Sequence, residues 1–525
     1  MRAWRDLIHH RHRTALRGKR GAPCEALLPD APMTALAFRS LYIDGCFREA
    51  AQGRTFEKRS PTTGQTLCVV AHAGAPDVDD AVRAAARAYA NGWGTSSLEE
   101  RAALLERVAA CLESRAEELA AAEAADTGKP LALARSMDIP RASANFRFFA
   151  QAGRERQAPR YDQLLPSGAA FVHRVLRKPL GVVAVICPWN LPLLLMTWKV
   201  APALIAGNTV VAKASELTPS TATLLAEAFH EAGAPPGVFN VVHGFGLGSA
   251  GEALANHPQV RAITFTGSSP TGQAIHRAAA QRLAKCSLEL GGKNPAIIFE
   301  DADLDAALAG TMRSTFTNCG QVCLCTERIY VQEGLYDTFR EALRARSAQL
   351  RSGAPDDPRT TLGPLISESQ QRKVWAALRD ALDAGATLIT GGAHPPTLDD
   401  PRLAGGHWCL PTLLEGLPHH HPFLQEEVFG PVAHLMPFTT EEEAIRLAND
   451  SRYGLCATVW TRDEERAARV GGALNVGMVW INDWMVRDLR VPFGGVGLSG
   501  LGREGGDVSL DFFTEPLVLT QPVAT

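Results

Sequence analysis

The sequence lacks the charge patterns and long apolar segments that mark several large classes of protein. Its 525 residues carry a formal net charge of −3, so neither a nucleic-acid-binding surface nor an acidic tail is indicated. The longest uncharged run lies between Lys178 and Lys199, but Pro188, Asn190 and Pro192 interrupt it. A helix within lipid would tolerate these residues poorly, so we interpret the run as a strand, a loop and a helix.

A disulfide framework is also lacking. The eleven cysteines, from Cys24 to Cys456, follow no regular spacing, and no segment resembles a secretory signal. We therefore expect a cytoplasmic protein in a reducing compartment. The basic stretch before Met33 lacks apolar periodicity, so residues 1–33 are expected to be an extension without a fold, either a targeting segment or a product of start-site choice.

At this length we expect two or three domains. Alanine-rich helical patterns occupy residues 76–151, and short β-branched runs then alternate with helices. Five strands joined by helical crossovers predict a doubly wound parallel sheet, with a nucleotide site at the carboxyl ends of its strands. The five runs are GVVAVIC (181–187), NTVVAKA (208–214), VFNVVHG (238–244), AITFTG (262–267) and CSLELGG (286–292).

A second alternation predicts another α/β lobe. It begins at NPAIIFE (294–300) and runs through RIYVQ, ATLITGG, GPVAHLMPF and MVWIND. RYDQLLPSGAAFVHRVLRKP (160–179) and LDFFTEPLVLTQP (510–522) are expected to be strands outside both lobes. Isolated strands pair with something, here another element or another subunit, so we expect a homodimer or homotetramer.

Two glycine-containing turns are candidates for contact with a nucleotide. GLGSAG begins at Gly246 and matches G-x-G-x-x-G between a strand and a helix, although a plain loop remains open in a chain with 46 glycines. Phe265, Gly267 and Ser268 form the second turn, which would present N–H groups and a hydroxyl at a helix N-terminus, or act as a simple N-cap. Glu216 follows the second strand, and its charge would oppose a 2′-phosphate, which favours NAD over NADP.

Three cysteines lie close together in FTNCGQVCLCTERIYV (316–331). Tetrahedral zinc would normally need four Cys or His ligands, and no histidine or second cysteine pair is near, so we expect no metal site. A catalytic thiol requires a loop that exposes the sulfur, because the thiolate is the nucleophile. The spacing alone does not choose between Cys319, Cys323 and Cys325.

Seven short motifs, taken in their order along the chain, indicate a protein family. They are PWN (188–190), KASE (213–216), FTGS (265–268), LELGGKNP (288–295), NCGQVC (318–323), EEVFGP (426–431) and PFGG (492–495). The same order is found in aldehyde dehydrogenases, which the chain resembles over roughly residues 40–518.

That resemblance implies an α/β fold with three parts: a Rossmann-like parallel-sheet NAD-binding domain, an α/β catalytic domain and a small β oligomerisation arm. We accordingly expect residues 34–158 and 180–291 to form the NAD-binding domain and 292–503 the catalytic domain. Residues 159–179 and 504–525 would form the arm.

The resemblance also implies the catalytic residues. In that family the nucleophile follows G-Q-x, which makes Cys323 the nucleophile and Cys319 and Cys325 bystanders. The Asn190 amide and the Cys323 backbone N–H would stabilise the oxyanion. After a hydride has passed to NAD, Glu289 would activate the water that hydrolyses the thioester.

By the resemblance, GLGSAG is not the main pyrophosphate-binding turn. The resemblance places the pyrophosphate near Gly267 and Ser268, the adenosine ribose at Lys213 and Glu216, and the nicotinamide ribose at Glu427. The full set of expected NAD-binding residues is Trp189, Lys213, Glu216, Gly246, Phe265, Gly267, Ser268, Leu290, Glu427 and Phe429.

The stretch NDWMVRDLRVPFGG bears on the substrate. It places Arg487 and Arg490 where many family members carry small or apolar residues, and an arginine fork would bind a carboxylate bidentately. Together with CLCTERIYVQ it resembles the dehydrogenases of 2-aminomuconic and 2-hydroxymuconic semialdehyde, from the meta-cleavage routes of aromatic catabolism. Arg141 matches the other substrate arginine of that subfamily. We expect NAD-dependent oxidation of such a semialdehyde to the acid through a thiohemiacetal and a thioester.

Other functions stay open at this point. One is a dehydrogenase of a betaine-type or aliphatic semialdehyde, without a carboxylate preference. A CoA-acylating dehydrogenase would not need the hydrolytic base Glu289. A cofactor-free cysteine esterase or a non-catalytic scaffold would not bind NAD. The sequence does not separate a 2-amino from a 2-hydroxy substrate.

Overall fold

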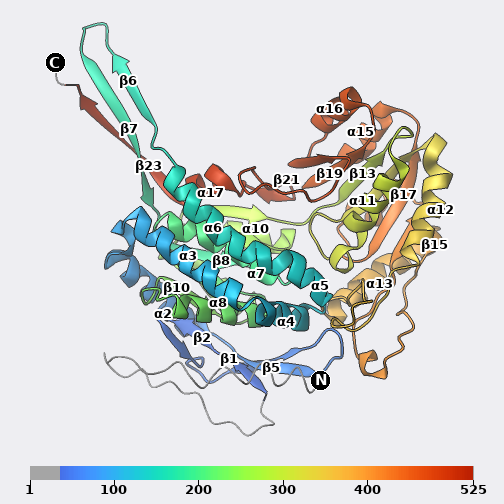
Figure 1. Cartoon of the computed structure of the whole chain (residues 1–525), viewed down its shortest axis with the longest axis horizontal. Helices are drawn as coiled ribbons and strands as arrows, with labels where there is room; N and C mark the ends of the chain where they lie inside the picture. Colours follow the sequence, from blue (N-terminus) through green and yellow to red (C-terminus); the bar gives the residue numbers. More distant parts are fainter. Residues whose placement is uncertain (1–35, 524–525) are drawn as a thin grey trace.

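The computed structural model describes residues 36–523, so the predicted extension 1–33 lies outside the described residues. Two large sheets with helices on their faces form the body, and a thin arm of strands projects from it (Figure 1). No helix within these residues is long and apolar enough to cross a membrane.

The first sheet contains the five predicted strands, all parallel to one another, which confirms the doubly wound arrangement. Its order is β22-β12-β11-β8-β9-β10-β2-β3. The short β2, β3 and β22 extend it by antiparallel pairing and were not predicted. The strands are β2 (Leu41–Ile43), β3 (Cys46–Arg48), β8 (Val182–Ile186), β9 (Thr209–Lys213), β10 (Phe239–Val242), β11 (Val260–Thr266), β12 (Lys285–Glu289) and β22 (Gly500–Leu501).

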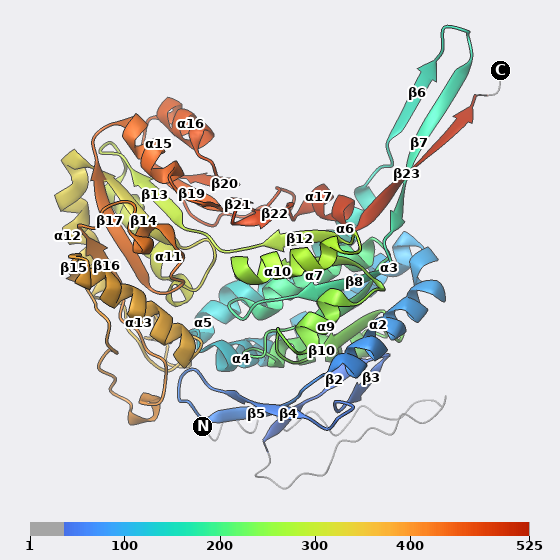
Figure 2. The same cartoon turned by 180° about the vertical axis from the view of Figure 1, so that it is seen from behind.

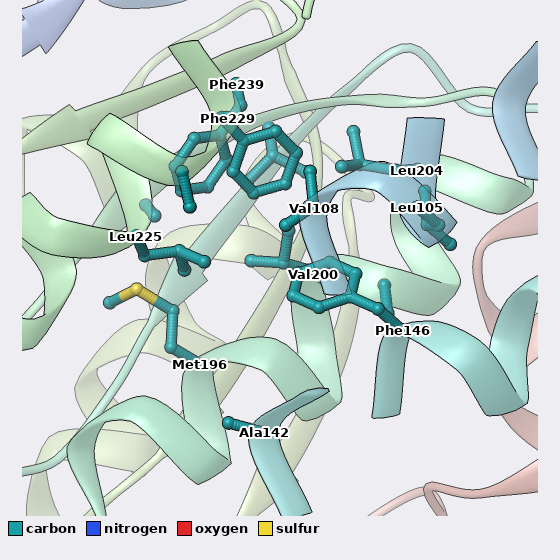
Figure 3. Close-up of a cluster of buried hydrophobic side chains, with 14 of the residues drawn as sticks. Leu105, Val108, Ala142, Phe146, Met196, Val200, Leu204, Leu225, Phe229 and Phe239 are labelled. Atoms are coloured by element: carbon teal, nitrogen blue, oxygen red, sulfur yellow. The ribbon is translucent and has the colours of Figure 1, made fainter. Parts of the chain in front are cut away.

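Both faces of this sheet are buried, which explains why its strands are continuous β-branched runs. On β8, Val183 and Val185 face one apolar cluster while Val182, Ala184 and Ile186 face another, because successive side chains point to opposite faces. The first cluster packs the sheet against α3 (Leu98–Ser114), α6 (Ile139–Glu155), α7 (Pro192–Ile205) and α8 (Ser220–Glu231) (Figure 3). The second packs it against α2 (Ala75–Ala90), α9 (Ala250–Asn256) and α10 (Ser269–Ala280).

The second sheet has the order β15-β16-β17-β14-β13-β19-β20 and is parallel except for β15. Of its strands, β16 and β19 were not predicted. Helices α11 (Leu304–Phe316) and α13 (Glu368–Asp383) contribute to the core on one face, and α15 (Glu441–Asn449) and α16 (Glu464–Ala473) to the core on the other. The strands are β13 (Asn294–Ile298), β14 (Thr326–Gln332), β15 (Thr387–Thr390), β16 (Thr412–Glu415), β17 (Val432–Phe438), β19 (Cys456–Trp460) and β20 (Met478–Ile481).

The arm is a three-stranded antiparallel sheet in the order β23-β7-β6 that extends away from the body in both views (Figures 1 and 2). Its strands are β6 (Arg160–Leu164), β7 (Ala170–Pro179) and β23 (Thr514–Pro522). The expectation that all of 504–525 belongs to the arm needs correction. Residues Gly506–Phe512 form the helix α17, which contacts α6 and α7, so the LDFF part of the predicted strand is helical or turn.

The remaining N-terminal segments complete the first lobe. A small separate sheet consists of β1 (Ala37–Arg39), β4 (Thr55–Arg59) and β5 (Thr66–Ala71). Beyond α3, the chain forms α4 (Ala116–Thr127) and then the π-helical turn η2 (Ala134–Asp138), which leads directly into α6. Such turns occur often at functional sites.

Two helical glycines allow a test of the packing in the second lobe. Gly310 on α11 leaves no room for a methyl group, because a Cβ there would lie 2.1 Å from the buried ring of Trp460. Gly472 on α16 faces open space. We expect Gly310→Ala to lower the free energy of unfolding by about 1–3 kcal/mol through overpacking, whereas Gly472→Ala leaves it unchanged or raises it by up to ~1 kcal/mol. Urea unfolding of both variants checks this, and equal effects would contradict the packing.

Candidate active site

The first sheet places several predicted residues at one edge. Ile186 pairs with Lys213, and Lys213 pairs with Val242, so β8, β9 and β10 end side by side. On the other side of β8, Thr266 pairs with Glu289 at the ends of β11 and β12. The loops that follow these ends carry Trp189, Asn190, Glu216, Gly246, Ser268 and Leu290.

The loop that carries Cys323 begins with a strained turn, η3 (Thr317–Gly320). Asn318 and Cys319 both have left-handed backbone conformations, with φ of 53° and 58°. Gly320 follows with φ of 68°, and a Cβ there would lie only 1.9 Å from the carbonyl oxygen of Gly430. Only glycine fits this position, and the cost of the turn is offset by the packing around it.

The three cysteines differ in exposure. Cys319 and Cys325 are buried, while Cys323 is half-buried. The Asn294 side chain holds the loop after the turn, because its Nδ2 donates to the carbonyl oxygens of Cys323 (2.7 Å) and Cys325 (2.8 Å). Cys323 is therefore the least buried residue of the three, as expected for a nucleophile with two bystanders.

Asn190 is tied to the same loop. The side-chain Nδ2 of Asn190 donates to the backbone carbonyl oxygen of Gln321 at 3.0 Å. The backbone carbonyl oxygen of Asn190 accepts from Asn318 Nδ2 at 3.1 Å and from Lys129 Nζ at 3.0 Å. Because a side-chain amide has two N–H groups, one N–H of Asn190 makes no hydrogen bond among the described residues. This arrangement suits an amide that stabilises a developing negative charge.

Glu289 is buried, and neither of its carboxylate oxygens has a hydrogen-bond partner within residues 36–523. Burial, reinforced by the negative charge of Glu504, raises its pKa well above the usual range, against the opposing charge of Lys199. Lys199 donates to the Glu504 carboxylate and to the Thr264 hydroxyl, so its charge is already engaged. Glu289 is thus a buried carboxyl that binds a proton strongly.

Two arginines from distant segments meet around one indole. The guanidinium carbons of Arg141 on α6 and Arg487 lie 5.4 Å and 5.2 Å from the ring centre of Trp198, and Arg487 also lies 4.4 Å from the ring of Phe493. Neither arginine has a salt-bridge partner in the described part of the chain. One terminal nitrogen of Arg487 is buried without any hydrogen bond. Burial lowers the pKa of each guanidinium to about 10, and both stay charged near neutral pH.

The sequence leaves open whether Arg490 also contacts the substrate. The Arg490 side chain is 79% exposed and makes an ion pair with Asp488 at 2.5 Å. An exposed ion pair of this kind contributes little to the free energy of folding, so Arg490 can stay at the surface. The arginine beside Arg487 is instead Arg141, whose Nε is held by Asn145 Oδ1 at 3.0 Å.

The residues expected to contact the adenosine and pyrophosphate differ in exposure and in how far their hydrogen-bonding groups are already engaged. Lys213 Nζ lies 3.9 Å from Glu216, whose side chain is partly exposed and free to accept other hydrogen bonds. The N–H of Gly267 donates to the carbonyl oxygen of Glu289 at 3.0 Å, so it is not one of the anion-binding donors. The hydroxyl of Ser268, the N-cap of α10, forms a hydrogen bond with the Thr271 hydroxyl. Gly246 lies in an exposed loop before α9.

The other expected cofactor residues lie where the two sheets approach each other. Glu427 accepts a hydrogen bond from the Gly292 N–H at 2.9 Å, and burial raises its pKa to about 7. The rings of Trp189 and Phe429 meet edge to face at 5.3 Å. Leu290 and Phe265 pack tightly, since a Cβ at Gly272 or Gly267 would lie within 2.5 Å of their side chains.

The sequence of residues 47–518 matches the profile of the aldehyde dehydrogenase family. The chain belongs to that family. It is 51% identical over 474 residues to a 2-hydroxymuconic semialdehyde dehydrogenase of Pseudomonas sp. (strain CF600), covering 90% of this chain and 97% of the relative. It is 49% identical, over 90% of this chain and 96% of the relative, to a 2-aminomuconic 6-semialdehyde dehydrogenase of Pseudomonas sp.. An aldehyde dehydrogenase from Bacillus cereus, solved as an NAD+ complex, superposes with a TM-score of 0.88 at 37% identity, covering 93% of this chain and 97% of that one.

Sequence reasoning missed several residues of this aldehyde dehydrogenase. Lys199 carried one usable signal, because it is a charge within the otherwise apolar helix α7 and is buried. Such a residue needs a partner, and the structure supplies Glu504. Glu504, Lys129 and Asn294 carried no comparable local signal, since their partners are far away in the sequence or depend on the turn at Gly320.

The Cys323 thiol of this dehydrogenase is expected to be weakly acidic in the absence of ligands. Burial raises its pKa to about 12, and the charges of Glu289 and Glu427 contribute in the same direction. Iodoacetamide reacts with the thiolate, whose fraction grows about tenfold per pH unit below the pKa. We therefore expect alkylation of Cys323 to accelerate about tenfold per unit between roughly pH 7 and 9. Mass spectrometry of the modified peptide measures it, and a rate that is flat above pH 7 would contradict the raised pKa.

Proposed function

We propose that this aldehyde dehydrogenase oxidises a carboxylate-bearing semialdehyde of the 2-hydroxymuconic or 2-aminomuconic type, with NAD, in aromatic catabolism. The observation that supports it most directly is the pair of half-buried arginines around Trp198, which lack a carboxylate partner among the described residues. Charges that are partly removed from water are costly unless paired, and a substrate carboxylate would supply the missing partner. The names of the two Pseudomonas relatives support the same substrates.

The proposed chemistry starts at Cys323. Its thiolate attacks the aldehyde carbon, and the oxyanion of the resulting thiohemiacetal accepts hydrogen bonds from the Asn190 amide and the Cys323 N–H. These donors are already fixed by the loop contacts, so little reorganisation is needed when charge develops. NAD, when bound, would supply the hydride acceptor, and Cys323 would then carry the thioester.

Glu289 is the proposed base. A carboxylate whose pKa is raised holds a proton more firmly than one in water, so ionised Glu289 would remove the proton of the Cys323 thiol. It would release that proton to solvent before it takes one from the hydrolytic water. Its unsatisfied oxygens leave both acceptor positions open to such donors. Hydrolysis by this base also distinguishes the proposed reaction from acyl transfer to CoA.

The residues at the sheet edge fit a dinucleotide. The partly exposed Glu216 at the end of β9 would accept hydrogen bonds from the adenosine ribose and repel a 2′-phosphate, which favours NAD over NADP. Lys213 would share this ribose. Ser268 and the N-terminus of α10 would face the pyrophosphate, with Gly267, Phe265, Gly246 and Leu290 nearby, and Trp189, Glu427 and Phe429 would enclose the nicotinamide ribose.

The arm supports a proposed homodimer or homotetramer. Within residues 36–523 its outer strands β6 and β23 each pair on one side only, and the arm exposes large apolar side chains, including Leu164 at 73% and Val518 at 60%. Exposed edges and apolar patches of this kind are normally covered by another chain. We also propose a cytoplasmic location, and the domain limits given above as the functional division, with the helix α17 assigned to the first lobe rather than to the arm.

The proposed function predicts NADH formation that depends on one sulfur. With enzymatically prepared 2-hydroxymuconic semialdehyde, the enzyme should reduce NAD faster than NADP, and Cys323→Ala should lower kcat by about a thousandfold or more. Absorbance of NADH measures both, and calorimetry confirms that the variant still binds NAD. Undiminished turnover by Cys323→Ala, or no binding of NAD, would overturn the proposal in favour of an esterase or a scaffold.

The arginine pair predicts a substrate-specific effect. Arg487→Ala should raise KM for the muconic semialdehyde about ten- to hundredfold, because a charge-assisted hydrogen bond is worth about 1.5–3 kcal/mol. KM for an uncharged aldehyde should change little. Arg490→Ala is the matched control, since that exposed side chain pairs only with Asp488 among the described residues. Steady-state kinetics on both substrates decides, and an equal loss on the two aldehydes would contradict the carboxylate clamp.

A further inference from the structure

A buried lysine lies behind the oxyanion-binding asparagine. The side chain of Lys129 is fully buried, and its Nζ donates to Asp138 Oδ2 at 2.5 Å and to the carbonyl oxygen of Asn190 at 3.0 Å. The lysine therefore connects a buried carboxylate to the backbone of a residue beside Cys323. No step of the proposed reaction uses it directly.

Lys129 Nζ lies between two buried carboxyl groups, and of these two it donates its hydrogen bond to Asp138. Glu123, also fully buried, lies 3.8 Å from Lys129 Nζ, and its two oxygens have no hydrogen-bond partner in the described chain. Burial raises the pKa of both Glu123 and Asp138, and the charge of Lys129 opposes this in part.

The local backbone brings Asp138 into place. Asp138 is the last residue of the π-helical turn η2, in which the hydrogen-bond ladder is widened before α6 begins. Met137, one residue earlier, packs against the apolar cluster of Leu191, Val322 and Leu324 that surrounds Cys323. In this turn Met137 thus packs against the apolar cluster at Cys323, and Asp138 accepts the hydrogen bond of Lys129.

We propose that Lys129, held by Asp138, is a positioning residue that fixes the Asn190 amide in the geometry needed to bind the oxyanion. The Asn190 carbonyl accepts from Lys129 and Asn318, while the Asn190 side chain donates to Gln321. With its backbone held on one side and its amide on the other, Asn190 has little freedom to rotate away from Cys323. Preorganised donors of this kind stabilise charge without reorganisation.

A purely structural role accounts less well for this pair. Buried ion pairs contribute little net stability, and apolar residues of similar volume often replace them without loss. What an apolar replacement could not supply here is the Lys129 donor to the backbone carbonyl of Asn190, one of two side-chain donors to this oxygen in residues 36–523. This inference rests on the proposed oxyanion role of Asn190.

Three variants separate positioning from stability. Lys129→Met removes the donor but leaves Asp138 charged and unpaired, so it should lower both Tm and kcat. In the double variant Lys129→Met with Asp138→Asn the stranded charge is removed, and Tm should recover most of the loss. We expect kcat of the double variant to stay about tenfold or more below that of the unmodified enzyme, with KM changed less than about twofold. Asp138→Asn alone keeps the lysine and should lower kcat severalfold.

Controls separate failure of this inference from failure of the proposed function. Lys58→Met removes another buried lysine, on β4 beside Asp126, and should lower stability but not kcat of the folded enzyme. Asn190→Ala should lower kcat by about a hundredfold or more, and adding it to Lys129→Met should cost little further, because both act on one group. A normal kcat for Asn190→Ala would sink the proposed oxyanion role itself. If Asn190→Ala is slow while the double variant regains normal kcat, only the positioning role of Lys129 is overturned.

Discussion

The hydrogen bond from the Asn190 side chain to the carbonyl oxygen of Gln321 joins the two lobes at the point where chemistry is proposed. Asn190 follows the central strand β8 of the first sheet, and Gln321 belongs to the loop that leads into β14 of the second. The nucleophile and its amide partner therefore come from different sheets, and their geometry depends on how those sheets are held together. The strained turn at Gly320, packed against Gly430, is the structural cost of bringing the loop into this position.

The surroundings of this contact collect charges that a stable core would normally avoid. Glu289 has no hydrogen-bond partner among the described residues, and Arg141 and Arg487 are stacked on Trp198 without a carboxylate. Each is expensive in isolation, and such groups concentrate at functional sites because ligands supply what the protein leaves out. By contrast, Lys199 with Glu504 and Lys129 with Asp138 are paired internally. The unpaired groups suit binding of the substrate and transfer of protons, and the paired groups suit holding the residues of the site in place.

Much of the fold followed from local patterns. The parallel strands β8 to β12 were predicted because strands buried on both faces are continuous β-branched runs bounded by turns. The short β2 and β3, of three residues each, are too brief to show a period. The segment LDFF was assigned to a strand, but α17 ends there. A mostly apolar segment of that length does not distinguish a strand from the end of a helix. The arm strands were identified, but that they pair with each other is a tertiary fact.

By itself, the sequence determined the family and, by resemblance, the proposed chemistry of Cys323, Glu289 and Asn190, since these residues lie within short contiguous motifs. Tertiary structure decided which charges have partners. Arg487 meets Arg141 on α6 rather than the nearby Arg490, and Lys199 pairs with Glu504, 305 residues away. The reason is physical: a motif records the identity of neighbours along the chain, whereas burial and pairing depend on segments that only folding brings together.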